Sequence, residues 1–113
     1  GALSGGMQQR TSLARTLAMH SQMILMDEPF AALDPFTRTQ MQQELLHLEE
    51  KVQIGTILVT HNIDEALTLG DRLLVLKNDR IAYSARLEEE KTARDLLSPV
   101  FIAEKRRLLT ALE

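Results

Sequence analysis

Two adjacent carboxylates, Asp27 and Glu28, follow the short apolar run Met23–Met26. In an extended segment, neighbouring side chains point to opposite faces, so these two can do different work. One carboxylate can hold a hard cation such as Mg²⁺, and the other can polarise a water molecule as a general base. Taken by itself, the pair is more simply explained as a solvated acidic turn after a strand.

A histidine occupies the equivalent place after the next apolar run. His61 follows Thr56–Thr60, and taken alone it is simply a polar residue entering a loop. If both runs are strands of one α/β sheet, the two carboxylates and His61 lie beyond its carboxyl edge, where such folds bind ligands. We therefore expect their side chains to converge on one crevice.

A third candidate is the sequence LSGGMQ at residues 3–8. Ser4 is a favourable N-cap for a helix that we expect to run to about Met19. Gly5 and Gly6 let the backbone approach a ligand closely, and a helix N-terminus offers free N–H groups and positive partial charge to an anion. In isolation, however, this stretch is better explained as a glycine-containing start of a helix.

The elements that must position these residues alternate between strand and helix. Both apolar runs, Met23–Met26 and Thr56–Thr60, are typical of buried strands. Asp34 as N-cap and Pro35 at the first helical position start a helix between them, which ends near Gly55. Apolar residues recur at helical spacing within it, namely Met41, Leu45, Leu48 and Val52.

The remaining elements follow from similar signals. Asn62 and Glu65 resemble a capping box that starts a helix to about Leu69. A third strand at 72–76 turns at Asn78-Asp79 into segment 80–84 as a hairpin. After the acidic run at 88–90 we expect one or two helices, anchored by Leu96, Leu97, Leu108, Leu109 and Leu112. Strands alternating with helices predict an α/β fold with a parallel sheet and flanking helices.

Composition excludes several classes of protein. The 113 residues suffice for one domain, and 44% hydrophobic with 26% charged residues is ordinary for a globular chain. A net charge of −3 argues against non-specific nucleic-acid binding. With no cysteine there is no disulfide or thiolate metal site, and no apolar run approaches the roughly 20 residues that span a bilayer. A membrane would therefore be met through a partner.

Together the motifs closely resemble the nucleotide-binding domain of the ATP-binding cassette (ABC) family, a P-loop NTPase-like α/β fold. LSGGMQ (3–8) is similar to the signature motif of that family and MILMDE (23–28) to its Walker B strand. ALD (32–34) resembles the D-loop, and His61 resembles the switch histidine. Four motifs in register make the resemblance strong, and it extends over essentially the whole chain.

The resemblance implies a role for each matching residue. Asp27 would help to hold Mg²⁺, indirectly, and Glu28 would be the general base that polarises the attacking water. His61 would contact the γ-phosphate of ATP, and Asp34 would lie at a dimer interface besides capping its helix. The signature residues would face ATP bound on the opposite subunit; they are Leu3, Ser4, Gly5, Gly6 and Gln8.

Two features depart from the family pattern. Asn62 stands where Asp is common, and since both cap helices well little changes. The P-loop G-x-x-x-x-G-K-[ST] is missing, since none of the glycines at 1, 5, 6, 55 and 70 is followed by Lys. We therefore expect residues 1–113 to be the C-terminal part of one ABC ATPase domain, inactive alone, with exposed sheet edges and apolar faces that favour oligomers or aggregates.

Within the family the sequence most resembles the ATPase subunits of importers for nitrate, sulfonates and taurine. This implies ATP and Mg²⁺ as cofactors, a second ATPase subunit as partner, and transmembrane permease subunits that hold the protein at the cytoplasmic face of the membrane. No nucleic acid is expected. Two alternatives stay open: a non-transport ABC ATPase, and a non-catalytic remnant or interaction module. In-frame sequence encoding a P-loop upstream of Gly1 would favour the importer.

Overall fold

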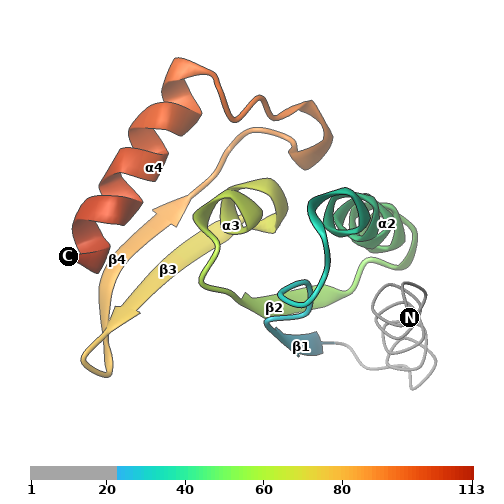
Figure 1. The fold of residues 1–113 in the computed structure, drawn as a ribbon, viewed down its shortest axis with the longest axis horizontal. Coiled ribbons are helices and arrows are strands. Elements are labelled where there is room, and N and C mark those ends of the chain that lie inside the picture. The colour runs from blue at the N-terminus through green and yellow to red at the C-terminus, as the bar shows by residue number, and fades with distance from the viewer. Residues whose placement is uncertain (1–22) are drawn as a thin grey trace. The chain divides into compact units, whose positions relative to one another are not determined.

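A computed structural model describes residues 23–113 of the chain (Figure 1). The chain divides after Thr60 into two compact units, Gly1–Thr60 and His61–Glu113, and each is described by itself. The helix predicted from Ser4 to Met19 lies outside the described residues, together with the whole signature motif.

The first unit contains a parallel strand–helix–strand crossover. Strand β1 (Met23–Asp27) pairs in parallel with β2 (Gly55–Val59), from Met23 opposite Gly55 to Asp27 opposite Val59. Helix α2 (Pro35–Val52) connects the two strands. The predicted parallel pairing is therefore confirmed, with β2 beginning and ending one residue earlier than expected.

The expectation that β1 and β2 are buried on both faces is wrong. In β1, Ile24 and Met26 are buried, but Met23 and Leu25 on the opposite face are 60% and 69% exposed. In β2, Ile57 and Val59 are also exposed. Successive strand residues point to opposite faces, so a pair of strands covered on one side alternates in burial even where the sequence is apolar throughout.

Helix α2 begins where the sequence predicts. The Asp34 side chain caps it, and Gln53 ends it in a left-handed conformation with φ 51°. Met41 and Leu45 are buried as expected. Val52, expected on the same apolar face, is instead 46% exposed because it lies in the last turn.

The second unit is built on an antiparallel hairpin. Helix α3 (Ile63–Leu69) leads into β3 (Arg72–Lys77), which pairs with β4 (Arg80–Arg86). Positive φ angles at both turn residues, 53° at Asn78 and 61° at Asp79, fit a type I′ turn and confirm the predicted hairpin. Within the described part of the chain β3 pairs with β4 alone, so the four strands form two separate two-stranded sheets rather than the single sheet expected.

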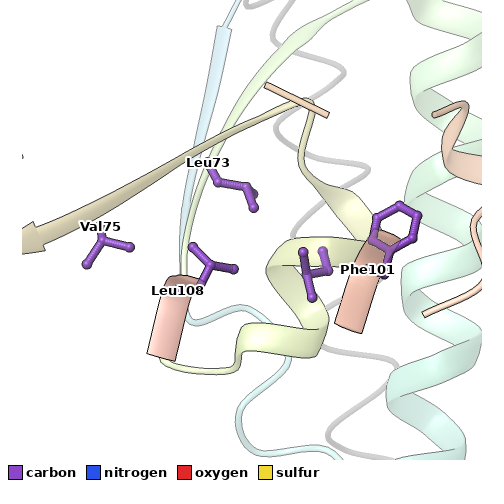
Figure 2. Packing of buried hydrophobic residues seen from close by; sticks show 5 residues of the cluster. Leu73, Val75, Phe101 and Leu108 are labelled. Carbon is purple, nitrogen blue, oxygen red and sulfur yellow. The ribbon is translucent and has the colours of Figure 1, made fainter. Parts of the chain in front are cut away.

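A single cluster of buried side chains joins α3, the hairpin and the C-terminal helix. A 3₁₀ turn at Lys91–Ala93 precedes helix α4 (Pro99–Leu112). Figure 2 shows Leu73 and Val75 of β3 beside Phe101 and Leu108 of α4, and Leu67 of α3 completes the cluster.

The leucine anchors predicted for the C-terminal region are only partly correct. Leu108 is buried and Leu96 packs against the cluster as a partly buried neighbour. Leu97, Leu109 and Leu112 are wrong as core residues, with 83%, 49% and 51% exposure. Leu97 precedes the helix, Leu109 lies off the stripe of α4 that faces the cluster, and Leu112 is the last residue of the helix.

Candidate functional site

The backbone places Glu28 directly beyond the end of β1 in a left-handed conformation. Its φ is 49°, which costs a non-glycine residue about 1 kcal/mol or more. The Glu28 N–H donates to the carbonyl of Val59 at 2.8 Å, which continues the β1–β2 ladder by one bond before the chain turns away. Asp27 is the last residue of β1 and Glu28 follows it, so both carboxylates lie at the carboxyl edge of the parallel pair. Asp27 is exposed and Glu28 is half-buried.

The loop after Glu28 is held in place by the buried side chain of Phe30 and by hydrogen bonds from Arg38 of α2. Phe30 is fully buried, and the Ala31 N–H donates to the Glu28 carbonyl at 3.3 Å. Arg38 donates from Nε to the Phe30 carbonyl at 3.4 Å and from Nη2 to the Leu33 carbonyl at 3.1 Å. Arg38 could not be found from the sequence, because no local pattern marks an arginine that donates to the loop before its own helix.

Asp34 is the N-cap of α2, as predicted. A side-chain oxygen of Asp34 accepts from the Thr37 N–H at 3.2 Å. The hydrogen bond to Thr37 lowers the pKa of Asp34 below its ordinary value of 3.8. The carboxylate is exposed, so capping leaves it accessible to a partner surface, and the interface role implied by the resemblance stays a prediction.

His61 begins the second unit, two residues after the end of β2. The helix that follows it is fixed at its start, since the Asn62 Oδ1 accepts from the Glu65 N–H at 3.0 Å. This confirms Asn62 as the N-cap of α3. His61 is exposed. Asp27 and Glu28 belong to the first unit, so convergence of His61 with them stays a prediction.

The donor set at the end of β1 suits a magnesium ion held mostly by other ligands. Among residues 23–113, no group of three or more His, Asp or Glu side chains is placed to hold a metal. Mg²⁺ takes one or two carboxylates and completes its shell with water and phosphate oxygens, and the single exposed carboxylate of Asp27 fits that use. The candidate phosphate-facing residues at 3–8 lie outside the described part of the chain. None of the described helices is long and apolar enough to cross a membrane.

Comparison with known proteins identifies the class to which this arrangement belongs. The family model described as "ABC transporter" matches residues 1–31. An aliphatic sulfonates import ATP-binding protein of Nocardia farcinica is 46% identical over 110 residues, covering 97% of this chain and 44% of that protein.

Two solved structures share the fold. One is a dimeric ATP-binding cassette in a post-hydrolysis state bound to ADP and Pi, with 38% identity, a TM-score of 0.65, and coverage of 78% of this chain and 38% of the other. The second, an ATP-binding cassette of an ABC transporter, has 27% identity and a TM-score of 0.72, and covers 98% of this chain and 40% of the other. Both define the fold as that of an ABC ATPase cassette.

The chain is similar over nearly its whole length to ATP-binding proteins of ABC transporters, and its first 31 residues match the family model. It spans less than half the length of the relatives named above.

Proposed function

We propose that the chain is part of the ATP-binding and ATP-hydrolysing subunit of an ABC importer. The observation that carries the proposal is Glu28, which extends the β1–β2 ladder by a backbone bond to Val59 and then turns the chain in a strained left-handed conformation. Strain of this kind persists where the surrounding structure requires it, and it gathers at functional sites. The 46% identity to a sulfonate import ATP-binding protein gives independent support.

In the proposed mechanism Glu28 is the general base. Its carboxylate accepts a proton from the attacking water and holds that water in line with the γ-phosphate. His61 donates to the γ-phosphate and keeps water and base aligned. Asp27 would help to hold Mg²⁺ indirectly, and the bound ion would supply positive charge to neutralise the phosphates.

The second half of the proposed site comes from another copy of the subunit. Ser4, Gly5 and Gly6, flanked by Leu3 and Gln8, face the ATP held by the opposite subunit, and Asp34 lies along the same interface. The relative with bound ADP and Pi is dimeric, which supports this arrangement. ATP binding would close two subunits and hydrolysis would reopen them, and transmembrane permease partners at the cytoplasmic face would use that motion for import.

We further propose that residues 1–113 supply the region from the signature motif to the C-terminal helices of one ABC ATPase domain. Because no glycine in the sequence is followed by lysine, the chain carries no P-loop to cradle the phosphates. Isolated residues 1–113 should therefore bind Mg-ATP negligibly. Tight one-site binding in a calorimetric titration of the isolated chain would contradict this.

The decisive experiment is Glu28→Gln in the full-length protein. Replacing the base while keeping its shape should reduce steady-state ATP hydrolysis by at least about a hundredfold and leave ATP binding unchanged. Glu50→Gln is the matched control, because Glu50 is an exposed residue near the C-terminal end of α2, at the opposite end of that helix from Asp34. Unchanged hydrolysis in Glu28→Gln would refute the assignment.

A second measurement addresses the signature motif. Ser4→Arg in the Glu28→Gln background should weaken ATP-driven dimer closure while each monomer still binds nucleotide. Sedimentation with and without Mg-ATP reports the closure directly. Equal dimerisation with Ser4 and with Arg at this position would rule out the proposed role across the interface.

A further inference from the structure

Helix α3 depends on partners outside itself. It has seven residues, Ile63–Leu69, which make a rod about 10 Å long, and a helix this short is unstable in isolation. Its first turn carries Asp64 and Glu65, which suit the positive end of the helix dipole, and Asn62 caps it. Its last turn carries no basic residue, so any cation at the negative end must come from elsewhere in the chain.

Arg94 provides that cation from beyond the hairpin. One nitrogen, Nη1, donates to the carbonyls of Leu67 at 2.8 Å and Gly70 at 2.7 Å, and Nε donates to the Glu89 carbonyl at 3.0 Å. The guanidinium carbon lies 5.9 Å from the ring centroid of the buried Phe101, within cation–π range. Arg94 therefore ties the end of α3 to the start of α4 and to the segment before the 3₁₀ turn.

The end of α3 is closely packed against β3, with no room for a side chain at Gly70. A Cβ added to Gly70 would lie 2.7 Å from the Leu73 Cδ2 and 2.8 Å from the Ala66 carbonyl oxygen, both below the limit of real contacts. Beside it, the Lys91 Nζ pairs with the Asp71 carboxylate at 3.1 Å. One of the two carbonyls that Arg94 binds, that of Gly70, thus belongs to a closely packed turn between α3 and β3.

We propose that Arg94 is a positioning residue for His61. It holds the C-terminal end of α3, and because α3 is short and capped at Asn62, fixing its far end also fixes the direction in which its near end presents His61. The inference rests on the proposed role of His61 in hydrolysis. It adds that this role depends on a residue 33 positions further along the chain, which touches neither substrate nor metal.

The test combines turnover with local hydrogen exchange in the full-length protein. Arg94→Met keeps an unbranched side chain over Phe101 but removes every donor. We expect faster amide exchange across α3 and a kcat for ATP hydrolysis lower by about tenfold to a hundredfold, with KM for ATP within about twofold. Arg94→Lys should restore part of both, because an ammonium can bind one of the carbonyls without the fork geometry of guanidinium.

Controls separate positioning from general stability. Arg106→Met makes the same chemical change at an exposed site on α4, where neither exchange nor kcat should change. All rates are measured well below the unfolding midpoint of each variant. If Arg94→Met accelerates exchange in α3 but kcat is unchanged, or if it changes neither, the proposal is overturned.

A double-mutant cycle with His61→Ala distinguishes this inference from the proposed function. If Arg94 acts through His61, Arg94→Met should lower kcat little further in the His61→Ala background. Full additivity of the two losses overturns the positioning role alone. Normal turnover in His61→Ala itself would instead refute the proposed role of His61 in hydrolysis, whatever Arg94→Met does.

Discussion

The contact between the hairpin and α4 allows a stability prediction with a worked magnitude. Tyr83 donates its hydroxyl to the Glu104 Oε1 at 2.8 Å, and Arg107 donates to the Oε2 from Nη2 at 2.7 Å and from Nε at 3.2 Å. Glu104 is 5% exposed, so its charge depends on these donors. A hydrogen bond to a charged group contributes about 1.5–3 kcal/mol. Arg107 still donates to Glu104 in Tyr83→Phe, so the carboxylate keeps part of its hydrogen bonding. Tyr83→Phe should therefore lower the free energy of unfolding by about 1.5 kcal/mol, the low end of that range.

The assay is urea unfolding of the wild type, Tyr83→Phe, Glu104→Gln and the double variant in the full-length protein. The coupling free energy between the two positions should be about 1 kcal/mol, because Tyr83→Phe removes the hydrogen bond and Glu104→Gln removes the negative charge that strengthens it. Burial, then the hydrogen bond to Glu104, raises the pKa of Tyr83 above its ordinary value of 10.0. The stabilisation by the hydroxyl is therefore complete below pH 10 and is lost as the pH rises through the higher folded value. Additive losses, or a difference between Tyr83→Phe and wild type that grows above pH 10, would refute this reasoning.

Four further predictions concern the cap, the core, the exposed sheet face and the strained residue. Asp34→Ala should destabilise α2, and Asp34→Asn should not, because asparagine caps helices as well as aspartate does. The folded pKa of Asp34 lies below 3.8, so the stabilisation by the cap is complete above that pH and is lost as the pH falls through the folded value. Urea unfolding of wild type and Asp34→Ala at pH 7 and pH 3 measures both effects. Leu67→Ala, at a site 1% exposed, should cost about 3 kcal/mol of unfolding free energy, while Leu112→Ala at an exposed site should cost under about 0.5 kcal/mol. Isolated residues 1–113 should self-associate at micromolar concentration, and Leu25→Lys should reduce the mass measured by light scattering; an unchanged mass would contradict a role for this face. Glu28→Gly should raise the unfolding free energy by up to about 1 kcal/mol while abolishing hydrolysis, and a less stable variant would show that the backbone there is unstrained.

Features set by neighbouring residues could be predicted from the sequence. Asp34 and Asn62 cap their helices because a short polar side chain reaches the N–H three residues later, whatever the rest of the fold does. The turn at Asn78-Asp79 likewise needs only two residues that tolerate positive φ. Such signals also placed Asp27 and Glu28 at the end of a strand.

Features set by distant residues could not be predicted. The apolar run of β1 gives no sign of which face is covered, so Leu25 was expected to be buried and is 69% exposed. Arg94 follows an acidic stretch in a region without periodicity, and its partners lie 24 and 27 residues earlier. Only the folded hairpin brings them together, which is why no local pattern identifies Arg94 as the residue that binds the carbonyls at the C-terminal end of α3.

Glu28 and His61, the two proposed catalytic residues, are held in place in different ways, so substitutions near each should have different effects. Glu28 depends on backbone geometry, namely a ladder bond to Val59 and a positive φ that a glycine would adopt at less cost. A glutamate in that strained conformation is expected if its carboxylate is required for function. The position of His61 depends instead on the short helix α3, which is capped by Asn62 at its start and bound by Arg94 at its end. Substitution near the carboxylate should therefore alter chemistry before stability, whereas substitution around α3 should loosen the histidine while the carboxylate edge stays intact.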